Sequence, residues 1–211
     1  MMTEHPILFS SEMVRAILEG RKTQTRRVIK PQPPEYCNLW AGWTTCCPDE
    51  KEIGKANWTD QPIPIFKNIF SARCPYGKPG DTLWVKEALY RGEWGNNNDA
   101  IYYQADESPV WDVGRPAQWC WGKSKLPSMF CPKGLSRLTL KVIGIGVERV
   151  KDISPEDVLA EGMPDGIAVG DLEQIKWFAN LWDIINAKHG FSFEENPWVW
   201  NVEFEDVNNG Q

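Results

Sequence analysis

The spacing of apolar and polar positions along the chain predicts short strands separated by helices. Period-two alternation or β-rich composition marks five segments as strands, namely residues 7–9, 82–86, 101–103, 137–150 and 198–204. In the last segment Trp198, Trp200, Val202 and Phe204 share one face,. Gly144 and Gly146 interrupt the longest segment, which predicts a bend or bulge there,.

Helical spacing and capping residues predict three helices. The first begins after Ser10 or Ser11 and ends near Gly20,. Ser154, followed by Pro155, begins a second helix that stops at Gly162, and a longer one spans about residues 172–188,. Few strands are joined by helical crossovers, so the order favours an α+β fold: a small, mostly antiparallel β-barrel with flanking helices.

Two long segments lack clear periodicity. Prolines fragment residues 31–69, and residues 107–133 are similarly irregular, so both are predicted to be irregular insertions in a single domain covering residues 1–211,. The chain has 12 Trp. Core packing is the favoured role for Trp84, Trp177, Trp182, Trp198 and Trp200, whereas base stacking stays open for Trp43, Trp111 and Trp121,.

Composition limits the class of protein. With 211 residues, 42% hydrophobic and 25% charged, the chain is typical of a globular protein, which excludes global disorder and collagen-like or coiled-coil architecture,. No apolar stretch approaches the about 18 residues that a membrane-spanning helix needs. The first six residues are polar and include no apolar signal region, so a cytoplasmic location is expected,.

The charge is unevenly distributed. A net charge of −6 argues against coating duplex DNA by bulk electrostatics,. Residues 21–30 nevertheless contain five basic side chains and no acid. This cluster is either a local anion site or a solvated face.

Histidine and cysteine usage bears on metal and nucleophile chemistry. Two His residues argue against a His-rich metal centre and a Ser-His-Asp triad,. Of the six Cys, a zinc site from Cys37, Cys46 or Cys47, and Cys74 is conceivable, but no C-x-x-C knuckle is present. Reduced, buried thiols are the favoured alternative, and we expect no metal and no cofactor.

The segment GRKTQTRR, residues 20–27, carries the most suggestive chemistry. Like charges around Lys22 disfavour its protonated form, and a neutral lysine can act as a general base. Thr25 is then a candidate nucleophile or water-orienting group. In a flat strand these two side chains face opposite sides, so they converge only if the chain still turns near Thr23.

Glu161 is the second candidate. It lies in the last turn of a predicted helix, where its charge opposes the helix dipole,. Simple solvent exposure explains such a residue. The alternative is a carboxylate held in a site as proton donor or acceptor.

Four segments together resemble the ASCH domains of the PUA-like superfamily, in the long form found in phage and prophage proteins. They are residues 11–27, 74–85, 136–140 and 196–200. The resemblance covers most of the chain and implies a PUA-like barrel with a cleft for RNA, a nucleotide or a modified nucleoside. A short relative is an amidohydrolase acting on N4-acetylcytidine. Its catalytic Lys, Thr and Glu correspond to Lys22, Thr25 and Glu161, although Gly162 stands where it has Asn.

The resulting hypothesis is a hydrolase of N4-acylated cytidine-type substrates. Arg21, Thr23, Arg26 and Arg27 are the expected ligand-binding residues of a basic cleft,. Two alternatives stay open: a metal-independent ribonuclease using the same cleft, and a non-catalytic phage protein that binds RNA or a partner. The sequence predicts no membrane partner and leaves the oligomeric state open.

Overall fold

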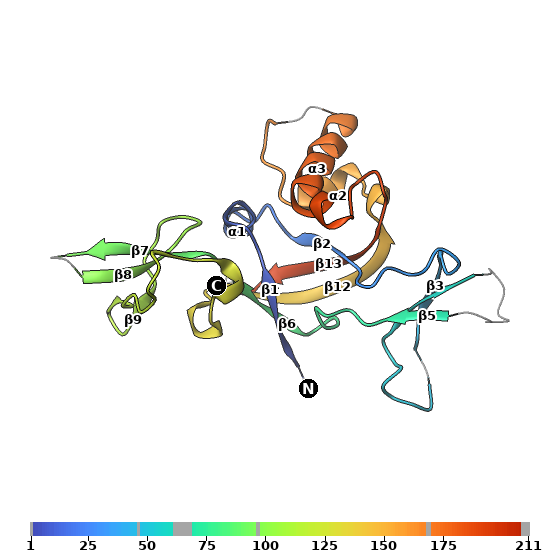
Figure 1. The fold of residues 1–211 in the computed structure, drawn as a ribbon, viewed down its shortest axis with the longest axis horizontal. Helices are drawn as coiled ribbons and strands as arrows, with labels where there is room; N and C mark the ends of the chain where they lie inside the picture. Colours follow the sequence, from blue (N-terminus) through green and yellow to red (C-terminus); the bar gives the residue numbers. More distant parts are fainter. Residues whose placement is uncertain (1, 46, 61–68, 96–97, 168–169, 208–211) are drawn as a thin grey trace.

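The computed structural model describes residues 2–45, 47–60, 69–95, 98–167 and 170–207, with a five-stranded sheet at its centre (Figure 1). Along the sheet the order is β1-β6-β12-β13-β2. β1 is parallel to β6, and the other neighbours are antiparallel. The bounds are Glu4–Leu8 for β1, Thr82–Lys86 for β6, Thr139–Arg149 for β12, Trp198–Asp206 for β13 and Gln24–Val28 for β2. The α+β, mostly antiparallel prediction is confirmed.

The predicted closure into a barrel is not found among the described strands. The hydrogen-bonded order leaves β1 and β2 as the two edges of the sheet. Each edge strand has only five residues, and the ladder does not return on itself,. Arg27 of β2 instead donates from Nη2 to the Leu8 carbonyl, so a side chain links the two edges.

Helices cover one face of this sheet, as Figure 1 shows for α2 and α3. The helices are α1 Ser11–Leu18, α2 Pro155–Ala160 and α3 Asp171–Asn186, with short 3₁₀ turns at Ser128–Phe130, Lys133–Leu135, Val150–Asp152 and Ala187–His189. The caps agree with the sequence. The Ser10 side chain accepts from the Met13 amide at 3.3 Å, and the Ser154 side chain accepts from the Asp157 amide at 3.1 Å,.

Two lobes extend from opposite sides of the central sheet (Figure 1). The tryptophan lobe is a three-stranded sheet of β3 (Leu39–Trp43), β4 (Ala56–Thr59) and β5 (Ile69–Ala72). The hairpin lobe pairs β7 (Leu89–Trp94) with β8 (Asn98–Tyr103) and β11 (Lys125–Leu126), and carries the short pair β9 (Trp111–Asp112) and β10 (Arg115–Pro116).

The two segments predicted to be irregular therefore contain strands. β3 and β4 lie within residues 31–69, and β9, β10 and β11 lie within residues 107–133. Their strands are two to five residues long, too short to produce a clear period against the surrounding prolines,. The single-domain organisation over residues 1–211 stays a prediction.

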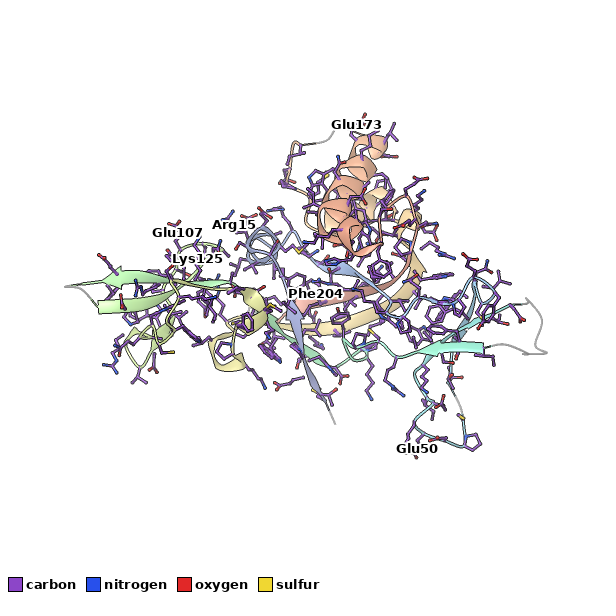
Figure 2. The ribbon with its side chains drawn as sticks, viewed as in Figure 1. Arg15, Glu50, Glu107, Lys125, Glu173 and Phe204 are labelled. Atoms are coloured by element: carbon purple, nitrogen blue, oxygen red, sulfur yellow. The ribbon has the colours of Figure 1, made fainter. Side chains whose placement is uncertain are left out.

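Three hydrophobic clusters form the interior. The largest joins the central sheet to the tryptophan lobe, and includes Phe204 (Figure 2) and Trp58. The second belongs to the hairpin lobe, and the third lies between the sheet and α2 and α3. β13 contributes to two of them, because Trp200 faces the first cluster and Val199 the third. This two-sided burial places β13 and its neighbour β2 directly beneath the helices.

A helix that crosses a bilayer must be both long and apolar. No helix among the described residues meets both requirements for crossing a membrane.

Candidate functional site

The chain reverses direction between α1 and β2, and this turn positions Lys22. Gly20 ends the helix with a φ of 73°, a left-handed conformation that suits glycine,. The amides of Arg21 and Lys22 then both donate to the Ala16 carbonyl, at 2.9 and 3.0 Å. Lys22 forms an isolated antiparallel bridge with Glu161, and Thr23 donates to the Ala160 carbonyl at 2.9 Å. The turn itself lies at Glu19 and Gly20, and Thr23 stands between the Lys22 bridge and β2, which begins at Gln24.

Lys22 is completely enclosed. Its ammonium donates to Glu161 Oε2 at 2.7 Å, to the Glu161 carbonyl at 2.8 Å and to the Gln24 carbonyl at 2.9 Å. These three acceptors match the three hydrogens of a charged lysine. The Phe9 ring lies on another side, with its centroid 5.7 Å from Nζ.

Glu161 is held at both carboxylate oxygens. Oε2 faces Lys22, while Oε1 accepts from the Arg26 amide at 2.6 Å and lies 3.4 Å from Arg26 Nη1. Glu161 is the C-cap of α2 and is buried. The simpler expectation of solvent exposure is therefore wrong, and the cost of a carboxylate at a helix C-terminus is offset by two cationic neighbours.

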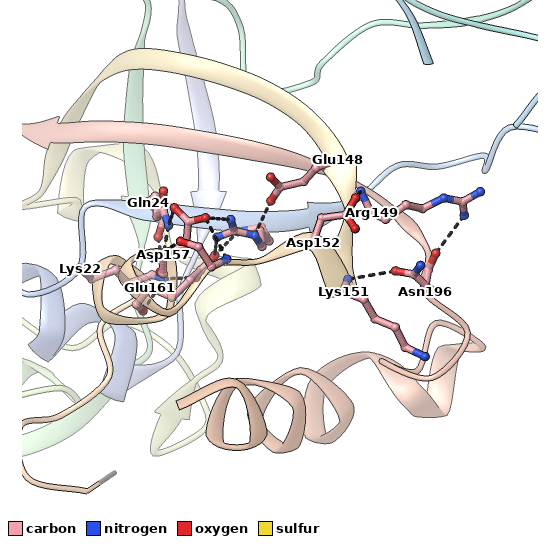
Figure 3. Close-up of polar contacts among 11 residues, drawn as sticks. Lys22, Gln24, Glu148, Arg149, Lys151, Asp152, Asp157, Glu161 and Asn196 are labelled. Atoms are coloured by element: carbon pink, nitrogen blue, oxygen red, sulfur yellow. Dashed lines mark hydrogen bonds and ion pairs between the residues drawn. The ribbon is translucent and has the colours of Figure 1, made fainter. Parts of the chain in front are cut away.

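Arg26 joins Glu161 to two further carboxylates (Figure 3). Its Nη2 lies 2.9 Å from Asp157 Oδ2, and its Nε lies 2.5 Å from Glu148 Oε1. Gln24 completes the network by donating to the carbonyl and to Oδ1 of Asp157, each at 2.9 Å. The cluster thus ties β2 to α2 and to the end of β12.

The pKa values of this cluster reflect burial first. Burial lowers the pKa of Lys22, opposed by the charge of Glu161 and assisted slightly by Arg27 and Arg26,. Burial raises the pKa of Glu148 although Arg26 opposes it. Burial acts against the charge of Asp157 too, but hydrogen bonding from Gln24 and the charge of Arg26 prevail and lower its pKa. The sequence foresaw the lowered Lys22 pKa from neighbouring charges, whereas its main cause is desolvation.

Gly162 allows the approach of Lys22 to the end of α2. Its φ is 96°, and a Cβ there would lie 2.9 Å from the Cβ of Ala16 and 3.0 Å from the Cβ of Lys22. A side chain at this position would therefore meet both α1 and the lysine stem. The departure from the family pattern at residue 162 removes bulk at the point where the two segments meet.

A groove of about 430 Å³ opens beside this cluster. One wall comes from α1 and its C-cap, with Met13, Arg15 and Glu19. The other wall comes from α3, with Trp177 and Leu181. The lining is completed by Ser10, Glu12, Ala16, Arg21, Glu161, Gly162 and Pro164. A smaller recess of about 50 Å³ shares Met13, Glu161 and Leu181 with the groove. The recess adds Thr25, Arg26 and Arg27 from β2. Glu161 therefore borders both spaces.

The seven residues expected in the site separate into distinct positions. Lys22 contacts Glu161 directly but lines neither the groove nor the recess. Thr25 is buried and lines the recess, while Thr23 is exposed. Their catalytic and ligand-binding roles stay predictions.

The three arginines differ in how free their donors are. Arg21 borders the groove, yet its guanidinium bonds the Gly162 carbonyl at 2.6 Å and also pairs with Glu19. Arg26 is surrounded by carboxylates. Arg27 packs its guanidinium on the Phe9 ring, 5.0 Å from the centroid, and its buried Nε has no hydrogen-bond partner among the described residues. Burial lowers the pKa of Arg27.

Sequence reasoning missed several residues here. Gln24, Glu148 and Asp157 complete the polar cluster. The Ser154-x-x-Asp157 capping pattern identified Asp157 only as part of a helix start, where it does form a capping box,. Trp177 was expected in the core, but it is half-buried and lines the groove.

The cysteines give no support for zinc in the described part of the chain. There, no group of three or more His, Cys, Asp or Glu side chains is arranged to hold a metal ion. Cys37 and Cys74 are buried, and burial raises the pKa of Cys74 to about 12. Cys46 lies outside the described residues.

Comparisons with known proteins concern the fold. No family model and no curated protein matches the chain. Two solved structures align with it at 12% identity and a TM-score of 0.41. They are the crystal structure of protein EF3133 from Enterococcus faecalis V583, with family model DUF984, and that of an ASCH domain from Lactobacillus crispatus JV V101. The alignments cover 98% and 97% of this chain, and 82% and 80% of the other chains.

The second of these structures is that of an ASCH domain, the family that the sequence resembles. It leaves the phage-type form open. At these values neither alignment bears on activity or on individual site residues.

Proposed function

We propose that the groove binds an acylated nucleoside and that the protein hydrolyses the amide bond of its acyl group. The observation that carries this proposal is the position of the Lys22–Glu161 pair: a buried lysine bonded at 2.7 Å to a carboxylate that borders both groove and recess. Buried pairs with a perturbed pKa beside a cavity are a common arrangement for proton transfer.

The charge of the groove favours a neutral ligand. Three of its lining residues are acidic, Glu12, Glu19 and Glu161, and two are basic. Arg15 donates to the Ala105 carbonyl and Arg21 pairs with Glu19, so both cations already have partners. The expected basic cleft is therefore weakly acidic along its lining, which disfavours phosphate and suits a nucleoside over a nucleotide or RNA. Trp177, Met13 and Leu181 supply surface for an apolar ring,.

The pair can change its protonation without rearrangement. If the shared proton moves from Lys22 to Glu161 along the 2.7 Å hydrogen bond, both groups become neutral. The two remaining hydrogens of Lys22 still have the Gln24 and Glu161 carbonyls as acceptors. Burial, which lowers the pKa of Lys22, favours this neutral form,. The proton then lies on Oε2 of Glu161, in the hydrogen bond to Lys22, and Glu161 itself borders the groove.

In the proposed reaction, the Lys22–Glu161 pair first accepts a proton and later donates it. Water, oriented by Thr25, or the Thr25 hydroxyl itself attacks the acyl carbon, and its proton passes to the Glu161–Lys22 pair. The C–N bond breaks as the pair returns a proton to the leaving nitrogen. With water the products are a carboxylic acid and the free amine of the base. With Thr25 an ester forms first, and a water then hydrolyses it. The unpartnered Nε of Arg27 is available to stabilise the oxyanion,.

The recess has the volume for a small acyl group. At about 50 Å³ it holds one or two waters or a two-carbon chain, whereas the groove has the volume of a nucleoside site,. An acetyl group in the recess places its carbonyl beside Thr25, Glu161 and Arg27. N4-acetylcytidine is accordingly the first substrate to test.

Binding without turnover is the second candidate, and one observation favours it. All three hydrogens of the charged Lys22 have acceptors within 2.9 Å, a saturated arrangement that also suits a purely structural ion pair,. In that case the groove retains ligands and the pair only holds β2 against α2.

The test is a mass-spectrometric turnover assay on acylated nucleosides and, in parallel, on a mixed RNA pool. We expect acetate release from N4-acetylcytidine by the wild type and its loss in Glu161→Gln and Lys22→Met. Lys141→Met serves as the matched control, because Lys141 pairs with Glu205 on the surface, 2.9 Å away. Shortened RNA with a cyclic phosphate end makes the protein a ribonuclease instead. Retention of nucleoside without turnover identifies a protein that binds the ligand and does not hydrolyse it.

A further inference from the structure

A second cavity lies away from the groove, between the tryptophan lobe and the central sheet. Its volume is about 400 Å³, close to that of the groove and within the range of small-molecule sites,. Trp43, Thr44 and Ile53 line it from the lobe, and Lys78, Pro79 and Ile145 line it from the sheet side. None of these residues borders the groove or the recess.

The aromatic wall of this cavity is fixed in place. The Trp43 ring stacks on Trp200 of β13, with centroids 6.0 Å apart and an interplanar angle of 23°. Trp40 meets Trp43 edge-on at 5.6 Å. Trp43 nevertheless stays 37% exposed, so one side of an immobilised indole is free beside the cavity. A rigid aromatic surface binds planar rings with little loss of conformational entropy.

The loop opposite Trp43 is also anchored. Gly54 donates to the Thr44 carbonyl, and Thr44 to the Lys55 carbonyl, each at 2.8 Å. Arg73, which follows β5, donates from Nη2 to the Lys51 and Ile53 carbonyls at 2.5 and 3.0 Å. These bonds hold Ile53 against the lobe, so the cavity is formed before any ligand enters.

The sheet side of the cavity is a tight turn with one cation. The Lys78 amide donates to Asp81 Oδ2 at 3.1 Å, and the Asp81 amide returns a bond to the Lys78 carbonyl at 3.0 Å. The backbone of Lys78 is thereby fixed while its exposed side chain is free to reach a ligand. The lining residues include this lysine and no acid, unlike the groove with its three carboxylates.

We infer that this cavity is a binding site for a small planar aromatic molecule that carries one anionic group. The ring lies against the free side of Trp43, and the anion pairs with Lys78 at the rim. The site is independent of the proposed hydrolysis, because it shares no residue with the groove. A bicyclic ring with one carboxylate fits both the volume and the single cation.

Naphthalene-2-carboxylate is the probe, and its neutral analogue naphthalene-2-methanol is the control for the charge. Binding is followed by indole N–H chemical shifts on ¹⁵N-labelled full-length protein, with Trp43→Phe identifying the Trp43 resonance. We expect saturable shifts confined to Trp43 and its neighbours Trp40 and Trp200. Lys78→Gln should weaken the carboxylate about fivefold and leave the alcohol unchanged, as for a partly exposed ion pair.

Two matched variants complete the experiment. Lys125→Gln and Trp94→Ala change an exposed lysine and a partly exposed tryptophan of the hairpin lobe, and both should bind the probe as the wild type does. The proposal fails if the Trp43 signal does not move, or if the shifts spread evenly over all indoles. It also fails if Lys78→Gln binds the carboxylate as tightly as the wild type. Since none of these variants alters Lys22, Glu161 or Thr25, the result is separate from the turnover assay.

Discussion

Two ion-pair clusters of this protein, each containing a buried glutamate, resemble each other in composition and differ in their surroundings. In one, Lys22 and Arg26 meet Glu161, Asp157 and Glu148. In the other, Arg137 meets Glu87 at 2.9 Å and Asp106 at 2.7 Å, and its guanidinium lies 3.9 Å from the Tyr103 ring centroid. The first borders the groove and the recess through Glu161, whereas Arg137, Glu87 and Asp106 border neither.

The pKa shifts of the two central cations run in opposite directions. Burial lowers the pKa of Lys22 despite its carboxylate. Burial also acts against the charge of Arg137, but the hydrogen bonds that Arg137 donates to Glu87 and Asp106 outweigh it, and the pKa of Arg137 rises. A buried ion pair is therefore no sign of a site by itself. The Lys22–Glu161 pair differs from the Arg137 cluster because it borders a cavity and holds a cation whose charge burial destabilises. These two properties support the proton-transfer role proposed for it,.

The largest expected contrast is in turnover. Glu161→Gln removes the group proposed to exchange protons with the ligand and should lower kcat/KM about 10²–10⁴-fold. Arg137→Met should leave it within a few-fold, once folded protein is selected by size-exclusion chromatography. Steady-state kinetics on N4-acetylcytidine measure both. Equal losses in the two variants would show that both clusters act only through the fold.

Arg137→Met should instead show its main effect in stability. Glu87 is 1% exposed, so Arg137→Met leaves a buried carboxylate without its bidentate partner and should lower the free energy of unfolding by about 3–5 kcal/mol,. Urea unfolding followed by tryptophan fluorescence measures the change. The double variant Glu87→Gln with Arg137→Met should recover part of the loss. No recovery would contradict a buried pair as the cause.

A smaller effect on stability is expected at Gly162, which lies against Lys22 of the first cluster. Gly162→Ala introduces a Cβ 2.9 Å from Ala16 and 3.0 Å from Lys22, at a φ of 96°. It should cost about 1–3 kcal/mol of unfolding free energy. Gly190→Ala is the matched control, because its φ is 78° with no atom within 4 Å of the new Cβ. The difference between the two variants, measured by urea titration, isolates the close approach to Lys22 from backbone strain.

The smallest expected effect is a pair of opposite pH dependences. The pKa of Lys22 in the folded protein lies below its ordinary value of 10.5. At pH values between these two pKa values, the unfolded chain therefore binds more protons than the folded protein does. Unfolding free energy should rise with pH there, by at most about 1.4 kcal/mol per pH unit, and Lys22→Met should lack the rise. Burial raises the pKa of Glu87 above its ordinary value of 4.5. The contribution of Glu87 to the unfolding free energy therefore falls as pH rises from 4.5 to its folded pKa. Glu87→Gln should lack this fall, and midpoints of urea unfolding across pH test both signs.

The sequence predicted helix caps and turns better than it predicted contacts between residues far apart in the chain. Caps at Ser10 and Ser154 and the turn at Gly20 depend on local backbone chemistry, and all three are where the pattern indicated. The direct contact of Lys22 with Glu161 joins residues far apart in the chain, and only the family resemblance linked them. Spacing alone offered no reason to bring them together.

The roles of the arginines lay beyond sequence reasoning. Residues 21–27 indicated a basic cleft. Arg26 instead forms ion pairs with Glu148, Asp157 and Glu161, whose positions depend on tertiary packing. The open sheet was missed for a similar reason. Strand count and alternation describe single strands, whereas closure depends on whether the edges β1 and β2 meet,.

Trp58 ties the order of folding to the order of synthesis. Its ring is fully buried, 5.9 Å from Trp198 and 6.3 Å from Trp200, so the tryptophan lobe shares its interior with β13 near the C-terminal end of the chain. The hairpin lobe instead packs around a hydrophobic cluster of its own, and none of the described members of this cluster belongs to β13. On a ribosome the hairpin can close as soon as residue 103 has emerged, while the earlier-made tryptophan lobe waits for β13 to leave the exit tunnel. Of the two lobes, the one synthesised first is therefore completed last.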